Sequence, residues 1–262
     1  MNIRLYQVDA FTDEIFHGNP AAVCPLESWL SDELMQKIAM ENNLSETAFY
    51  IRDGNKYQIR WFTPTVEVDL CGHATLASAF VLFNYEKFVG DIIHFISRRS
   101  GELIVTKAER LLTLNFPADV IKPAQLTNEL INCFDLMPEQ ALRGKTDYLL
   151  IYNSEKDIES LIPRFDLISK LDCRGIIVTA KGTNSDFVSR FFGPQSGVDE
   201  DPVTGSAHTT LTTYWAERLG KTEMKAVQLS ARKGHLKCKY LKERIEISGQ
   251  CRLYMKGEIT ID

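Results

Sequence analysis

The alternation of apolar and polar residues predicts a chain dominated by strands. Period-two patterns, typical of half-buried strands, occur in the first half at 4–11, 21–25, 44–51, 57–62, 92–97 and 103–116. In the second half they occur at 148–152, 175–180 and 186–192, with hairpins predicted for the rest through Ile261. The pattern therefore favours a mixed protein built mainly on β-sheet.

A few helices are predicted between these strands. Ser31 is suited to cap a helix that runs through Met40. A second helix begins near Gly72 and is apolar on nearly every side, which predicts that it is buried. A third runs from Gly205 to Leu219 and ends at Gly220. We expect each half of the chain to be a sheet wrapped around one central helix.

Three segments of the first half recur in the same order in the second. RWFTP at 60–64 matches RFFGP at 190–194 with an offset of 130, EVDLCGHA at 67–74 matches EDPVTGSA at 200–207 with an offset of 133, and SRRSGEL at 97–103 matches SARKGHL at 230–236, again at 133. This regularity indicates an ancient internal duplication. We predict an N-terminal half, 1–117, joined by a terminal strand at 252–262, and a C-terminal half, 118–251.

The duplication predicts where a ligand would bind. Similar halves can pack about a pseudo-twofold axis, and ligands favour the interface between domains, so the matched turns are expected to face one catalytic cleft. Each turn precedes a helix, whose first N–H groups are unpaired and carry partial positive charge. Gly72 and Gly205 allow close approach to that backbone. A carboxylate or an enolate fits this arrangement better than a phosphate, because no phosphate-binding glycine motif is present.

Composition narrows the classes of partner. The 262 residues are 44% hydrophobic and 25% charged with a net charge of −5, which argues against nucleic acid and anionic membrane surfaces. The longest apolar stretch, 74–83, is too short to span a bilayer, and no signal-peptide pattern opens the sequence. Six scattered cysteines form no CxxC pair, so we expect buried thiols and no metal site. A cytoplasmic location is expected.

Two titratable residues of the first half are candidates for acid–base chemistry. In a strand, Glu46 would share a face with Leu44, Ala48 and Tyr50. If that face is buried, desolvation would raise the pKa of the carboxyl group and suit it to act as a general base. The alternative is a solvated strand carboxylate. His73 falls in the first turn of the second helix, where a structural histidine is the alternative.

For three polar residues beside the matched glycines, a structural role is the alternative to a role in the site. Asp201 and Ser206 are each suited to cap the third helix. Cys71 is suited to pack as a small buried hydrophobic residue.

Taken together, several motifs resemble the phenazine-biosynthesis isomerase (PhzF-like) family over nearly the whole chain. They are VDAFT at 8–12, GNPAAV at 18–23, SETAF at 45–49, RWFTPTVEVDLCGHAT at 60–75 and EDPVTGSA at 200–207. The resemblance implies the diaminopimelate-epimerase-like fold. This α+β fold has two pseudosymmetric halves, each an antiparallel barrel-like sheet around a central helix.

The resemblance also implies a chemistry and a set of roles. Family members isomerise a small carboxylated substrate without a metal or an organic cofactor, and they are often homodimers. By motif, Glu46 matches the acid/base glutamate, and His73 and Asp201 match catalytic polar residues. The expected substrate-binding residues are Gly72, Gly205, Ser206, Cys71 and Asn19.

Some residues at matched positions differ between the two halves, and these differences favour one reaction mechanism over another. Related racemases use a cysteine before each glycine, but Thr204 stands where a second cysteine would match Cys71, which disfavours a two-thiol mechanism. A shift of 128 brings Glu46 opposite Arg174, so the carboxylate has no acidic twin. We therefore expect one principal base. The rival hypotheses are an amino-acid or hydroxy-acid epimerase that uses Cys71, and a carboxylate-binding protein that has lost turnover.

Overall fold

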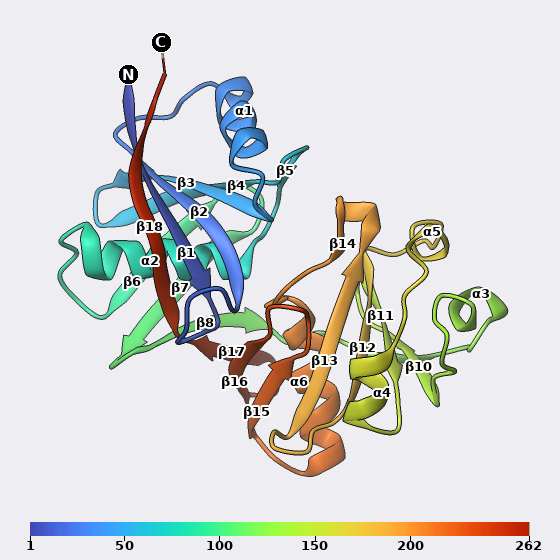
Figure 1. Ribbon diagram of the computed structural model, residues 1–262. Coiled ribbons are helices and arrows are strands. Elements are labelled where there is room, and N and C mark those ends of the chain that lie inside the picture. Colours follow the sequence, from blue (N-terminus) through green and yellow to red (C-terminus); the bar gives the residue numbers. More distant parts are fainter. Residues whose placement is uncertain (262) are drawn as a thin grey trace. The chain divides into compact units, whose positions relative to one another are not determined.

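The computed structural model describes residues 1–261, which form two compact units (Figure 1). The N-terminal unit comprises Met1–Asn115 together with the chain from Ser248 onward, and the C-terminal unit comprises Phe116–Ile247. Among the helices of the described residues, none is long and apolar enough to cross a membrane.

The N-terminal unit is one sheet wrapped around a buried helix. Its elements are β1 (Asn2–Ala10), β2 (Asn19–Leu26), α1 (Asp32–Asn42), β3 (Glu46–Asp53), β4 (Lys56–Phe62), β5 (Glu67–Val68), α2 (Gly72–Tyr85), β6 (Ile92–Ser97), β7 (Gly101–Ala108), β8 (Leu111–Pro117) and β18 (Cys251–Thr260). The strand order is β18–β1–β2–β3–β4–β6–β7–β8, in which β2–β3 and β4–β6 are parallel pairs and the others antiparallel. Helix α2 contacts β1, β2 and β3 and buries residues 73–79, as its apolar sequence predicts.

The C-terminal unit repeats this topology. Its elements are β9 (Lys122–Ala124), α3 (Asn128–Ile131), β10 (Gln140–Arg143), β11 (Asp147–Ile151), α4 (Glu155–Ser160), α5 (Phe165–Ile168), β12 (Gly175–Lys181), β13 (Phe187–Gly193), η1 (Pro194–Ser196), β14 (Val198–Glu200), α6 (Ala207–Leu219), β15 (Glu223–Gln228), β16 (Gly234–Tyr240) and β17 (Arg244–Gly249). The order is β9–β10–β11–β12–β13–β15–β16–β17, and the parallel pairs β11–β12 and β13–β15 fall at the positions of β2–β3 and β4–β6. The matching pattern of pairings supports the duplication inferred from the sequence.

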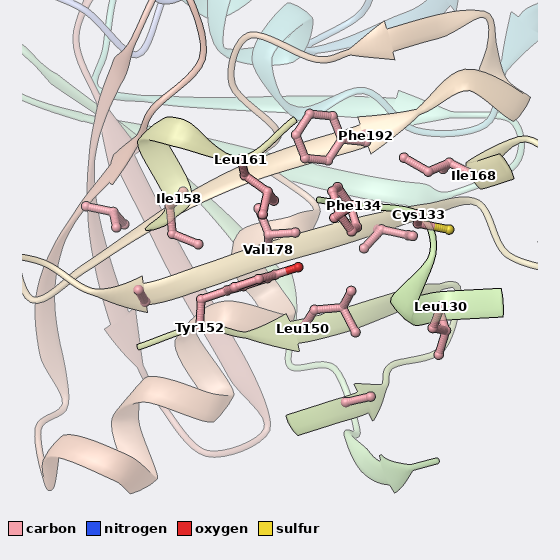
Figure 2. Packing of buried hydrophobic residues seen from close by; sticks show 14 residues of the cluster. Leu130, Cys133, Phe134, Leu150, Tyr152, Ile158, Leu161, Ile168, Val178 and Phe192 are labelled. Carbon is pink, nitrogen blue, oxygen red and sulfur yellow. The ribbon is translucent and has the colours of Figure 1, made fainter. Parts of the chain in front are cut away.

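Both faces of β12 are covered, because helices pack on either side of it. Val178 points into a cluster that also contains Phe134, Ile158 and Phe192 and through which α4 and α5 pack on the sheet (Figure 2). The neighbouring Thr179 points to the opposite face, where its hydroxyl accepts a hydrogen bond of 3.0 Å from Trp215 of α6. Helix α6 is therefore the counterpart of α2.

Local signals account for some of the element boundaries. The hydroxyl of Ser31 accepts a bond from the backbone N–H of Leu34 and caps α1, and Gly220 ends α6 in the left-handed conformation at φ 64°, both as predicted. The prediction of one strand at 103–116 is wrong, because β7 and β8 form a hairpin that turns at Glu109, with φ 54°. The alternation continues across this short turn and hides it.

The duplication extends to a pair of arginine–glutamate interactions. Arg60 donates two hydrogen bonds to Glu67, of 2.7 and 2.8 Å, and Arg190 donates two to Glu200, of 2.7 and 3.0 Å. Each guanidinium also lies over the phenylalanine ring two residues further along its strand, at 5.1 and 4.8 Å. Each pair joins its long strand to the short segment that leads into the central helix.

Replacing Arg60 with methionine is expected to destabilise the protein by about 3 kcal/mol, because it leaves a partly buried carboxylate without its partner. The Arg60 side chain is only 3% exposed and also pairs with Asp32 at 2.7 Å. Urea unfolding measures the loss. Arg99→Met is the matched control, since Arg99 is 54% exposed and solvent screens its pair with Asp69, so a much smaller loss is expected. Equal effects of the two substitutions would contradict this expectation.

Candidate active site

The first strand residue of β3 and the first turn of α2 bring a carboxylate and an imidazole together. Glu46 Oε2 lies 3.2 Å from His73 Nε2, and the two side chains are 16% and 5% exposed. Beyond Glu46, Ala48 and Tyr50 are buried, as predicted for this face. Leu44, the remaining residue of the predicted face, precedes β3 and is only half-buried. The carboxylate is therefore held at the edge of an apolar interior and within proton-transfer distance of the ring.

The contacts of the ring define its protonation state. Burial lowers the pKa of His73 to about 3, so the ring is neutral near pH 7. The amide nitrogen of Asn19 lies 3.2 Å from Nδ1 and donates to it. A neutral imidazole that accepts at Nδ1 carries its proton on Nε2, and this N–H faces Glu46. Cys71 Sγ lies 3.5 Å from the same Nδ1.

Asn19 is placed by the tight turn that precedes it. Gly18 has φ +65°, and a Cβ at this position would collide with the carbonyl oxygen of Ala10. Only glycine fits this conformation and this close approach. Asn19 itself is fully buried, and its contact with His73 makes it a residue that orients the ring.

The matched turn of the C-terminal unit is held by a glutamine. Gln228 donates to the carbonyl of Asp201 at 2.7 Å and accepts from the backbone N–H of Thr204 at 2.8 Å. The Thr204 hydroxyl donates to the Asp201 carboxylate at 2.6 Å. Asp201 therefore braces the turn, and the alternative that it caps the following helix is wrong.

Ser206 occupies the capping position of α6 but makes no capping bond. Its hydroxyl instead accepts a hydrogen bond of 2.7 Å from Arg174, so the alternative of a capping hydroxyl is also wrong. Cys71, at the capping position of α2, likewise forms no side-chain cap. Within residues 1–261, α1, α3 and α4 are capped by side chains, whereas the two helices that follow Gly72 and Gly205 are not. The side chains at these two capping positions therefore do not bond to the first N–H groups of α2 and α6.

Strand register corrects the sequence comparison around Glu46. Phe49 pairs with Arg60, and Val178 pairs with Arg190, so the offset between β3 and β12 is 129 rather than 128. Glu46 then corresponds to Gly175 instead of Arg174. The inference that Glu46 has no acidic counterpart is unchanged.

The sequence alone does not indicate a role for three residues around the C-terminal turn, Arg174, Asp147 and Gln228. Arg174 and Asp147 pair across 27 positions, and Gln228 reaches Thr204 across 24, so no local motif or periodicity marks them. The parallel β11–β12 pairing, which sets Asp147 opposite Gly175, is what brings Arg174 beside Asp147.

One group of donors could hold a metal ion. A carboxylate oxygen of Glu46, the thiol of Cys71 and a ring nitrogen of His73 lie within 4.8 Å of one another. Mixed oxygen, sulfur and nitrogen ligands suit Zn²⁺. The expectation of a metal-free site stays a prediction.

The structure has two duplicated halves around central helices and a carboxylate–imidazole pair at one helix start, and curated relatives over the full chain are named isomerases, so the protein is an enzyme of the isomerase class. The sequence model of the family described as "Phenazine biosynthesis-like protein" matches residues 8–257, and the chain belongs to this family.

Relatives and solved structures agree with this assignment. An uncharacterized isomerase of Pseudomonas aeruginosa is 51% identical over 262 residues, which cover 100% of both chains. A human phenazine biosynthesis-like domain-containing protein is 38% identical, covering 99% of this chain and 100% of its own. The crystal structure of a PhzF family protein from Enterococcus faecalis matches with a TM-score of 0.96 and 45% identity over 100% of each chain.

More distant structures share the fold alone. A hydroxyproline epimerase from Agrobacterium vitis has a TM-score of 0.64 at 7% identity, covering 98% of this chain and 92% of its own. Together these neighbours confirm the expected diaminopimelate-epimerase-like fold.

Proposed function

We propose that the protein is a cofactor-independent isomerase of a small carboxylated metabolite, with Glu46 as its principal acid/base. The observation that carries the proposal is the 3.2 Å contact between the Glu46 carboxylate and the neutral His73 ring. The absence of an acidic counterpart in β12 supports one base rather than two opposed ones.

In the proposed reaction, ionised Glu46 removes a proton from a carbon next to an unsaturated or carbonyl group. The C–H electron pair moves into the conjugated system, and the protonated Glu46 returns the proton to another carbon. One C–H bond breaks and one forms, so the reaction needs no oxidant or reductant. His73 orients the carboxylate, and the uncapped N–H groups at the start of α2 are donors for the substrate's own carboxylate. Contributions from Asp201, Gly205 and Ser206 to substrate binding stay predictions.

A screen of small unsaturated and keto carboxylates in deuterium oxide tests the proposal. NMR and mass spectrometry report both a change of isomer and deuterium taken up from solvent. The expected result is a new positional isomer labelled at the carbon that receives the proton. A carboxylate that raises the melting temperature but shows neither change would instead identify a binding protein without turnover.

An epimerase that uses Cys71 is the second candidate, because the thiol is 5% exposed and lies 3.5 Å from His73 Nδ1. Cys71→Ser separates the two functions. A thiol base predicts a loss of about 100-fold or more with label only at the α-carbon. The proposed isomerase predicts that Cys71→Ser changes turnover by only about threefold, because the thiol is then not the base and serine keeps a polar group of similar size beside His73.

A further inference from the structure

Three residues of the C-terminal unit form a chain of hydrogen bonds that ends at Ser206. Arg174 Nε donates to Asp147 Oδ1 at 2.8 Å, and Nη2 donates to Asp147 Oδ2. The Asp147 side chain is 3% exposed and begins β11, so its position is fixed by the sheet. The guanidinium also lies 5.0 Å from the centre of the Phe191 ring. These contacts hold the remaining nitrogen, Nη1, at 2.7 Å from Ser206 Oγ.

This geometry determines what the Ser206 hydroxyl can do. A guanidinium has only donors, so Ser206 Oγ accepts from Arg174 and its own hydrogen must point elsewhere. Among the described residues, no acceptor is found for that hydrogen, and Ser206 is partly exposed to solvent. The hydroxyl is therefore a donor held in readiness at the start of α6, and polarisation by the charged Arg174 strengthens it.

We propose that Arg174 is a positioning residue that fixes Ser206 as a donor to a carboxylate oxygen of the ligand. This inference rests on the proposed function, which makes the substrate a carboxylate. Because Asp147 compensates the charge of Arg174, the pair attracts an anion little by net charge, and Arg174 acts through the hydroxyl. The N-terminal unit has a comparable arrangement. His73 occupies the position that matches Ser206, and it lies beside Glu46, the first residue of β3.

A double-mutant cycle on ligand binding tests the inference, with benzoate as the probe and benzamide as its neutral isostere. Replacing Arg174 alone would leave the buried Asp147 carboxylate unpaired and threaten folding. The cycle therefore combines the charge-neutral variant Asp147→Asn/Arg174→Met with Ser206→Ala. Thermal melting verifies that each variant is folded, and titration calorimetry gives the dissociation constants.

Asp147→Asn/Arg174→Met and Ser206→Ala are each expected to weaken benzoate binding about tenfold. The triple variant is expected to bind no more weakly than either of them, because both changes remove the same hydrogen bond from Ser206 to the ligand. Benzamide binding is expected to be weaker and to change less. Effects that multiply in the triple variant would show that Arg174 acts independently of Ser206. Unchanged dissociation constants, or no benzoate binding by the wild-type protein, would overturn the inference. The cycle measures binding without turnover, so its outcome is separate from the role of Glu46.

Discussion

Glu46→Gln is expected to lower turnover of an isomerised carboxylate by about a thousandfold, within the usual contribution of a general acid–base group. Glutamine keeps the shape and polarity of the side chain but accepts no proton at neutral pH. It also keeps an oxygen that can face the Nε2 hydrogen of His73, 3.2 Å from the present carboxylate. The substitution therefore removes the base while leaving the surroundings in place. Stopped assays of isomer formation, together with deuterium uptake, measure the loss.

The matched control is Glu41→Gln, which makes the same chemical change at an exposed position of α1. It is expected to leave both readouts within about twofold of the wild type. Thermal melting shows whether either variant has lost its fold. If Glu46→Gln retains a tenth or more of wild-type turnover, as an order-of-magnitude threshold, Glu46 is not the principal base.

Mild acid is expected to destabilise the protein because two histidines are buried in neutral form. Burial lowers the pKa of His73 to about 3 and that of His208 to about 4. In the unfolded chain both would titrate near pH 6.5. Below that pH the unfolded state binds protons that the folded state does not, so the free energy of unfolding falls as pH falls. The loss ends near the folded pKa of each ring.

The expected slope is about 1.4 kcal/mol per pH unit for each histidine between about pH 6 and pH 4.5. Urea unfolding at half-unit intervals measures it. His208→Asn removes one titrating ring and is expected to make the slope shallower by that amount. Parallel curves for the wild type and His208→Asn would show that His208 does not control acid stability.

Much of the scaffold is predictable from the sequence, because its strands and buried helices follow local patterns of apolar and polar residues. Alternation marked most strands, and the apolar run after Gly72 predicted a buried helix that the structure contains. The prediction from sequence is wrong where the local pattern does not determine the geometry of the chain. The alternation through 103–116 hides a turn at Glu109, and the comparison at Glu46 slipped by one residue because strand register depends on cross-strand pairs that no single segment encodes.

The candidate site shows the same division. Glu46 and His73 carry recognisable motifs, and the structure brings them together. Asp201 and Ser206 were correctly placed beside a helix start, but their partners were not foreseen. Gln228 and Arg174 come from distant strands, so only the folded topology reveals that they hold the turn and the hydroxyl. Burial of a polar side chain, which sets the pKa of His73, is likewise a property of the whole fold.

The pairing of β1 with β18 has a consequence for biosynthesis. Nine residues of β1 pair with β18, and the Met1 amino group donates to the Ile261 carbonyl at 2.5 Å. A ribosome makes β18 only after it has made the entire C-terminal unit. The N-terminal unit is therefore made first but stays incomplete, with one edge of β1 unpaired, until the end of the chain leaves the ribosome. During this interval the nascent chain exposes a strand edge open to wrong partners, and chaperone protection matters most there.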